Sequence, residues 1–222
     1  ISTFTGAASF AAGVSVASDL SIASSLVHTG DTDTKISFAT NTIKFDTDTS
    51  ERCRIDSSGR LLVGSTTDDG TGSLAQVAAT GVTASFSARR YSNSSGPARL
   101  YLFKSRGTSI DTQTIVQDGD DLGEVLFQGS DGTDAAPAAL IKAQVDGTPG
   151  NDDMPGRLVF STTADGAVSS TERMRINSLG QIVQGTTTAR ERVHFHYDSS
   201  DENYLRFTNS TTGTAAGDGF NI

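Results

Sequence analysis

The chain carries one phrase of eighteen residues twice, and this internal repeat limits the folds that it can adopt. The first copy reads SERCRIDSSGRLLVGSTT over residues 50–67, and the second reads TERMRINSLGQIVQGTTT over residues 171–188. Nine positions are identical without a gap, where chance gives roughly one, so we expect both copies to form the same structural unit. The identities that define the phrase are Glu51, Arg52, Arg54, Ile55 and Gly59 in the first copy and Glu172, Arg173, Arg175, Ile176 and Gly180 in the second.

Each copy has the pattern of a β-hairpin. Charged and apolar residues alternate over 52–55 and 173–176, which is the two-residue period of a half-buried strand. Turn-forming residues follow and end at Gly59 and Gly180, where glycine takes a positive φ at low cost. An extended apolar run then resumes, so a strand, a tight turn and a second strand are predicted in both places.

The repeat extends upstream as a further strand. NTIKFDTDT at 41–49 precedes the first copy, and GRLVFSTTADGAVSS at 156–170 precedes the second. The arginines of each copy are expected to point outward or to bind acidic neighbours, where exposed pairs contribute only about 0–1 kcal/mol. We predict equivalent interior positions for Ile43, Phe45, Cys53 and Ile55 in one copy and for Leu158, Phe160, Met174 and Ile176 in the other.

The rest of the sequence predicts an all-β chain of four segments. Residues 1–25 alternate apolar with small polar residues and suit an intertwined β shaft, because one such strand buries too little surface alone. Residues 26–73 hold the first β module and a linker, 74–190 a second and larger β module, and 191–222 the start of a truncated third module. The larger module contains strand-like runs at 98–105, 123–130, 139–147 and 156–162, and the third module places Leu205, Phe207, Phe220 and Ile222 in strands.

The composition favours an elongated, shared β-structure over one large core. Hydrophobic residues make up 35% of the chain, with 23 glycines and no tryptophan, whereas typical domains have about 45–50% apolar residues. No apolar run approaches the roughly 20 residues of a membrane span, so membrane insertion is not expected. There is no signal peptide pattern, and a chain that starts at Ile1 and stops within a pattern is expected to be a fragment.

The formal net charge is −9, and an acidic surface repels phosphate backbones, so nucleic acid is not an expected partner. Lys and Arg are scattered, apart from Arg89 and Arg90, a pair too short to define a basic patch. The single cysteine, Cys53, excludes an internal disulfide; because it stands where the other copy has Met174, we interpret it as a small buried hydrophobe.

The repeated phrase, with the residues around it, resembles modules of phage tail fibres. Residues 24–64, SSLVHTGDTDTKISFATNTIKFDTDTSERCRIDSSGRLLVG, resemble a module of fibres from phages of marine bacteria and cyanobacteria. Residues 103–185 look like a second module of the same proteins. Cys53 and Leu179 depart from the usual apolar and serine choices of these modules.

The resemblance implies a homotrimeric fibre, carried on the virion outside the host cell and used in host attachment. Its implied partners are two further copies of the chain, other virion tail proteins, and a host surface glycan or outer-membrane protein. Members of this group often end in an intramolecular chaperone domain that drives trimerisation, and nothing in this sequence corresponds to that domain or to an N-terminal virion anchor.

Two patterns that resemble binding motifs are interpreted as turns. Residues 70–75 fit the dinucleotide pattern G-x-G-x-x-A, but β-branched residues and glycine follow where a helix is required. Acidic clusters lack the spacing of an EF-hand, so no metal or other cofactor is predicted, although the same carboxylates leave a glycosidase pair open. These clusters are Asp31/Asp33, Asp46/Asp48, Asp118/Asp120/Asp121/Glu124 and Asp131/Asp134.

The pair His194 and His196 has the His-x-His spacing that binds iron along the axis of some phage fibres. In a strand, both rings share one face, and Val193, Phe195 and Tyr197 share the other. Burial of each of these apolar side chains contributes roughly 1.5–3 kcal/mol, so the face that carries them is the one expected to be buried. The two histidines would then point away from the interior, and a metal ion on the fibre axis is not predicted.

The leading hypothesis is therefore a structural and adhesive segment of a virion tail fibre, with no catalytic residues. A tailspike-type depolymerase of host polysaccharide is one alternative, which would show paired carboxylates in a cleft. A passive fibre spacer, with receptor binding elsewhere, is another. Apolar stripes without a partner in the same chain predict a parallel homotrimer, because threefold symmetry closes such an interface.

Overall fold

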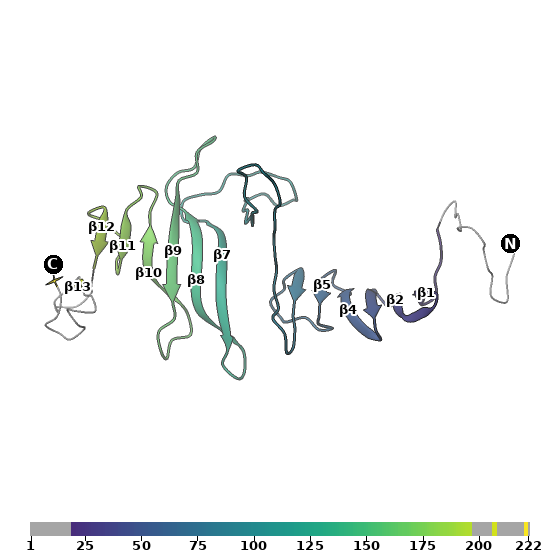
Figure 1. The fold of residues 1–222 in the computed structure, drawn as a ribbon. Coiled ribbons are helices and arrows are strands. Elements are labelled where there is room, and N and C mark those ends of the chain that lie inside the picture. Colours follow the sequence, from purple (N-terminus) through teal and green to yellow (C-terminus); the bar gives the residue numbers. More distant parts are fainter. Residues whose placement is uncertain (1–18, 197–205, 208–219, 222) are drawn as a thin grey trace. The chain divides into compact units, whose positions relative to one another are not determined.

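The computed structural model describes residues 19–196, 206–207 and 220–221, and every regular element in this part of the chain is a β-strand (Figure 1). The all-β class predicted from the sequence is therefore confirmed. The chain divides into two compact units, Ile1–Ala98 and Arg99–Ile222, and each unit contains one six-stranded sheet. The described residues contain no helix that could cross a membrane.

The first sheet is a meander in which each strand pairs with the next along the chain, in the order β1-β2-β3-β4-β5-β6. Asp48 and Thr49 connect β3 to β4 with φ of 51° and 59°, the two positive values of a tight type I′ hairpin. Pairing is antiparallel except between β5 and β6. The strands are β1 Ser25–His28, β2 Asp31–Ala39, β3 Thr42–Thr47, β4 Ser50–Ile55, β5 Leu61–Val63 and β6 Ala75–Val77.

The second sheet has the same plan, in the order β12-β11-β10-β9-β8-β7, and its six strands stand side by side in Figure 1. A bulge between Phe127 and Gln128 interrupts the register of its two longest strands. A separate antiparallel pair, β13 (Arg206–Phe207) and β14 (Phe220–Asn221), lies near the end of the chain. The strands of the sheet are β7 Asp121–Ser130, β8 Ala135–Val145, β9 Gly156–Thr162, β10 Thr171–Ile176, β11 Ile182–Gln184 and β12 Val193–Phe195.

The two copies of the phrase form the same hairpin in these sheets. Cys53 pairs with Val63 and Ile55 with Leu61, while Met174 pairs with Gln184 and Ile176 with Ile182 in the same register. The turn closes in both copies with two backbone hydrogen bonds, donated by the first and the last residue of the turn. Gly59 and Gly180 take φ of 78° and 73°, as the turn pattern predicts.

The sequence did not predict a fourth strand in each repeat, parallel to the hairpin. After the hairpin the chain crosses over and returns as β6 or β12, parallel to β5 or β11, with Leu61 opposite Ala75 and Ile182 opposite Val193. The backbone amides of Gly64 and Gly185 donate to the carbonyls of Arg52 and Arg173, each three residues before the last residue of its strand, Ile55 or Ile176. The unit that repeats is thus β3–β6 and β9–β12, longer than the phrase that reveals it.

One predicted strand is wrong. Residues 98–105 have strand-like alternation, yet they form no ladder with any described strand. Leu102 lies against the backbone of Gly123 in β7, where an added Cβ would meet its Cβ at 2.6 Å. Tyr101 and Phe103, however, are each 75% exposed. A period of two predicts an extended backbone, but a strand also needs a neighbour to take its hydrogen bonds.

The segment boundaries drawn from the sequence stay predictions. Most of the predicted shaft, 1–25, and of the truncated module, 191–222, lies outside the described residues. Two described strands pair across these predicted boundaries. β6 lies after the boundary at 73/74 but pairs with β5 in the first sheet, and β12 lies after the boundary at 190/191 but pairs with β11 in the second sheet.

Candidate functional site

The first sheet presents a continuous apolar face that nothing in the described part of its unit covers. Directly paired residues share one side of a sheet, so the apolar residues of successive strands gather on a single face. Eight of these side chains are 36–50% exposed, whereas apolar side chains in an ordinary core are well buried. The face comprises Leu26, Ile36, Phe38, Ile43, Phe45, Cys53, Ile55, Leu61, Val63 and Val77.

The second sheet presents the equivalent face. Leu158 and Ile176 occupy the positions of Ile43 and Ile55, and all four side chains are between 36% and 40% exposed. The residues predicted to face equivalent interiors therefore have equivalent surroundings, but within one chain those surroundings are half open. The face comprises Val125, Phe127, Ile141, Leu158, Phe160, Met174, Ile176, Ile182, Val193 and Phe195.

The opposite side of each sheet is where the single chain is well packed. Leu62 and Val183, the middle residues of β5 and β11, are 1% and 0% exposed. They pair with Arg54 and Arg175, whose guanidinium groups lie on that same side. The packed residues of each hairpin therefore lie on its polar side, whereas most of the large apolar side chains opposite are half exposed; in the second sheet Val145, at the end of β8, is an exception, fully buried on the apolar side.

An ion pair repeats on this polar side. Arg54 donates Nε–H and Nη2–H to the two carboxylate oxygens of Glu51 at 2.5 and 2.8 Å, and Arg175 binds Glu172 at 2.5 and 2.6 Å. The hydrogen bonds from Arg54 hold the pKa of Glu51 below its ordinary value. Four of the predicted repeat residues thus bind one another in pairs.

The other two arginines of the phrase lie in more exposed places. Arg52 donates to Thr47 Oγ1 at 2.8 Å and lies 3.9 Å from a carboxylate oxygen of Asp48, and Arg173 donates to Thr162 Oγ1 at 3.0 Å. Each of these bonds joins the phrase to the strand before it, so they support the sheet.

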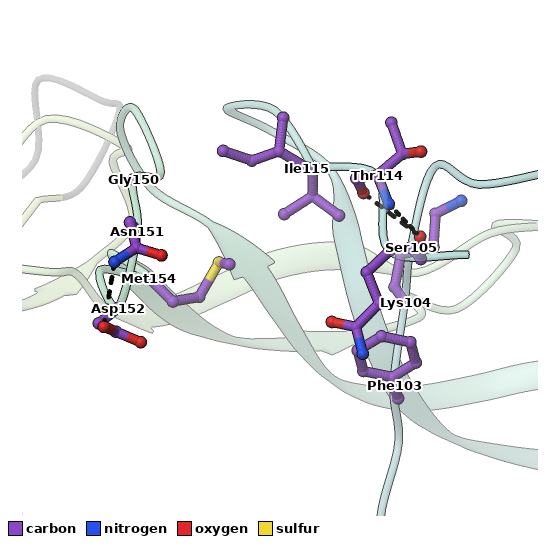
Figure 2. A pocket seen from close by; sticks show the side chains of 11 residues that line it. Phe103, Lys104, Ser105, Thr114, Ile115, Gly150, Asn151, Asp152 and Met154 are labelled. Carbon is purple, nitrogen blue, oxygen red and sulfur yellow. Dashed lines mark hydrogen bonds between the residues drawn. The ribbon is translucent and has the colours of Figure 1, made fainter. Parts of the chain in front are cut away.

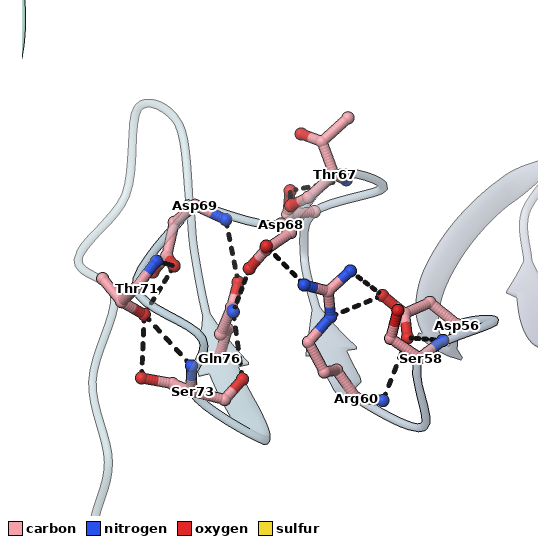
Figure 3. A network of polar contacts seen from close by, with 10 residues as sticks. Asp56, Ser58, Arg60, Thr67, Asp68, Asp69, Thr71, Ser73 and Gln76 are labelled. Carbon is pink, nitrogen blue, oxygen red and sulfur yellow. Dashed lines mark hydrogen bonds and ion pairs between the residues drawn. The ribbon is translucent and has the colours of Figure 1, made fainter.

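A polar network holds the crossover between β5 and β6 (Figure 3). The Arg60 guanidinium lies between the carboxylates of Asp56 and Asp68 and binds both. Gln76, 8% exposed, donates to Asp68 at 2.7 Å and accepts from the backbone amide of Asp69 at 3.2 Å. These groups satisfy one another, so the network explains the loop geometry and leaves no open binding group.

A hollow of about 490 Å³ in the second unit lies between residues 103–116 and 150–154 (Figure 2). Phe103 and Met154 flank it, and Asn151 and Asp152 form its polar wall, with a hydrogen bond of 3.1 Å between them. Asp152 is the single carboxylate among its lining residues, whereas glycoside hydrolysis uses two carboxyl groups. The hollow has the size of a ligand site but not the catalytic pair of a depolymerase.

The acidic clusters are engaged in turns and ion pairs. Asp31 accepts from Thr34 Oγ1 at 2.8 Å, and Asp131 accepts two backbone N–H groups of its own turn at 2.8 Å. Arg106 binds both carboxylate oxygens of Asp120 at 2.6 Å, which holds the pKa of that carboxyl well below its usual range. The described residues contain no group of three or more His, Cys, Asp or Glu side chains placed to hold a metal ion.

The two histidines lie on the polar side of the second sheet. His194 pairs with Val183, and its Nδ1 lies 3.1 Å from the carbonyl of Thr188. The ring of His196 is edge-on to it, with 6.2 Å between centroids. Val193 and Phe195 belong to the open apolar face. An interior built on the apolar face would therefore leave both imidazoles outside it.

The fold is similar to that of a phage tail fibre domain. The chain aligns with the carboxy-terminal domain of the bacteriophage T5 L-shaped tail fibre at a TM-score of 0.54 and 16% identity, covering 84% of this chain and 83% of that one. It aligns with the same domain carrying its intra-molecular chaperone domain at a TM-score of 0.56 and 17% identity, covering 85% of this chain and 58% of that longer one. No protein-family model and no curated protein matches the chain.

Proposed function

We propose that this chain is a structural and adhesive segment of a phage tail fibre, part of the virion outside the host cell, that contributes to host attachment without catalysis. The observation that carries the proposal is the open apolar face repeated in both sheets. The similarity to the T5 tail fibre domain supports the same role, and the repeated module suits a fibre that grows by adding units.

The open faces support a parallel homotrimer. An apolar face of this size on a soluble protein marks a surface that another chain covers. A threefold arrangement lets each module bury its face against two copies of itself and leaves no edge for uncontrolled pairing. The N-terminal shaft of 1–25 belongs to the same proposal, as three intertwined strands. Its other partners would be further virion tail proteins and a host surface glycan or outer-membrane protein.

The mass of the purified chain in solution tests the assembly. Light scattering should give three times the chain mass of 23.1 kDa, and crosslinking should yield trimers without larger species. A folded and soluble single chain would contradict the proposal, because its two apolar faces would then be stable in water.

Adsorption tests the attachment role. Labelled chain should bind to cells of a susceptible bacterial strain and should compete with the phage for adsorption. If the labelled chain does not bind host cells, while the complete fibre does bind them, this segment is a passive spacer. Release of reducing sugar from host polysaccharide would instead identify a depolymerase and contradict the non-catalytic role.

A further inference from the structure

The stretch between Asp69 and Asp111 contains no acidic residue, although the whole chain has a net charge of −9. Five cations fall within it: Arg89, Arg90, Arg99, Lys104 and Arg106. By sequence alone, Arg89 and Arg90 are too short a pair to define a basic patch. In the structure these two arginines differ from the other arginines of the same unit, which have carboxylate partners.

The first unit has five arginines, and three of them bind carboxylates. Arg52 lies by Asp48, Arg54 binds Glu51, and Arg60 bridges two aspartates. Arg89 and Arg90 form no ion pair with any residue in the described part of the chain, and both are exposed. Their charges are therefore not neutralised by any carboxylate in the described part of the chain.

The two cations belong to a small ordered loop, residues 87–96, that we call the arginine loop. Arg89 Nε donates to Ser87 Oγ at 3.0 Å, and Arg90 Nη2 donates to Ser94 Oγ at 2.6 Å. The side chain of Arg90 folds back over Gly96, where an added Cβ would lie 1.8 Å from Nη1. Hydroxyl contacts orient the two guanidinium groups without neutralising them.

Tyr91 follows Arg90 in the chain and adds an exposed aromatic side chain to the same loop. Its ring is 88% exposed, which is far above the 36–50% of the side chains on the open apolar face of the first sheet. An exposed aromatic ring in the same loop can stack against a sugar ring, while guanidinium groups bind an anionic substituent through paired hydrogen bonds. Arginine suits this task better than lysine, because its planar fork matches carboxylate and phosphate oxygens.

We infer that the arginine loop binds the anionic groups, phosphate or carboxylate, of a polysaccharide on the host cell surface. This inference rests on the proposed attachment function and names the chemistry of its ligand. An acidic fibre is repelled by a surface rich in such groups, so contact needs a local region of opposite charge. The arginine loop is such a region, and its neighbouring residues on both sides carry no acid.

The test uses the full 222-residue chain and four immobilised polymers: phosphomannan, the same mannan after phosphatase treatment, polygalacturonate, and neutral dextran. The chain should bind phosphomannan, polygalacturonate or both, more weakly as salt rises, and should not bind dextran or dephosphorylated mannan. Retention on one acidic polymer alone assigns the ligand to phosphate or to carboxylate.

Matched variants assign the binding to the loop. Arg90→Gln should weaken binding about tenfold and Arg89→Gln/Arg90→Gln should weaken it further, because charge-assisted hydrogen bonds are lost. Arg52→Gln removes the same charge from a paired arginine and should change binding by less than about twofold. Gly96→Ala should act like Arg90→Gln, since the new methyl displaces the guanidinium, whereas Ser95→Ala should have no effect.

Three results would overturn the inference: equal retention on neutral and acidic polymers, unchanged binding by the double variant, or an equal loss with Arg52→Gln. Adsorption of the same variants to cells separates the two proposals. If wild type and double variant adsorb equally, attachment stands and the arginine loop is not its ligand site. If wild type does not adsorb but binds acidic polymers through the two arginines, the loop stands and the attachment role fails.

Discussion

The two repeats use the same turn with different chemistry. In the first, the carboxylate of Asp56 accepts the backbone amides of Ser58 and Arg60 at 2.9 and 3.0 Å. In the second, the amide oxygen of Asn177 accepts those of Leu179 and Gln181 at 3.1 and 2.9 Å. The side chain four residues on then binds back to Asp56 through a guanidinium and to Asn177 through an amide.

This comparison separates what the module needs from what it tolerates. The turn needs an oxygen that accepts two backbone hydrogen bonds, and a charge on that oxygen is not required. The apolar face, the Glu–Arg pair and the glycine beside the returning strand are the same in both repeats, so we expect substitutions there to have similar effects in each. Substitutions in the turn should have different effects on stability in the two repeats.

The largest effect is expected on the apolar faces. Phe45→Asp and Phe160→Asp should each abolish trimers, because three buried carboxylates would replace aromatic side chains that contribute about 1.5–3 kcal/mol apiece. Light scattering gives the mass. Thr66→Asp, in an exposed loop, adds the same charge and should leave the trimer intact. If only one phenylalanine proves necessary, the two faces are not equivalent in assembly.

The next effect concerns the glycine that the returning strand approaches. A Cβ on Gly64 would lie 2.1 Å from the carbonyl oxygen of Ala78, and one on Gly185 would lie 1.8 Å from that of His196. Both glycines also have positive φ, so Gly64→Ala and Gly185→Ala should each cost at least about 2 kcal/mol of unfolding free energy, measured by denaturant titration.

The turn glycines are the matched control for that experiment. Gly59 has a similar positive φ, but nothing lies within 4 Å of the position of its Cβ. Gly59→Ala should therefore cost only the backbone term of about 1–2 kcal/mol. Equal losses for Gly59→Ala and Gly64→Ala would mean that the parallel strand β6 does not press on the hairpin as the structure shows.

A smaller effect is expected from the repeated ion pair. Glu51→Gln should lower the unfolding free energy at neutral pH by about 0.5–1 kcal/mol, since the pair is only partly shielded from water. Arg54 lowers the folded-state pKa of Glu51. Its contribution is therefore complete above the unfolded pKa of about 4.3 and is lost as the pH falls through the lower folded value. Thermal melts of wild type and variant should converge on acidification, and a constant difference would contradict this.

The smallest effect should come from exchanging the turn residues. Asp56→Asn keeps the acceptor oxygen and should shift the melting temperature at pH 7 less than Glu51→Gln does. Arg60 lowers the pKa of Asp56, so the wild-type turn stabilises the fold above the ordinary pKa of Asp and loses this on acidification, while the variant does not. Asn177→Asp should introduce no such dependence of comparable size, because Gln181 supplies no charge. A large loss from Asp56→Asn would show that the charge is needed.

Much of the fold was predictable because the pattern is local. Alternation over residues 52–55 places Ile55 and Arg54 on opposite sides of a strand whatever lies nearby. The turn and its glycine follow from backbone preferences within four residues. The same reasoning predicted a strand at 98–105 and was wrong, because alternation says nothing about whether a partner strand exists.

Sequence alone therefore established the repeated hairpin, the all-β class and the residues that share a face, since these depend on neighbours one to four positions apart. Tertiary structure decided that β6 and β12 return parallel to the hairpin, that the packed side is the one with Leu62 and Val183, and that the apolar side stays open. It also showed which arginines have carboxylate partners and which do not. Those outcomes depend on the crossover connections 64–74 and 185–192 and on pairs of residues distant in the chain. A pattern of neighbouring residues does not determine the geometry of either.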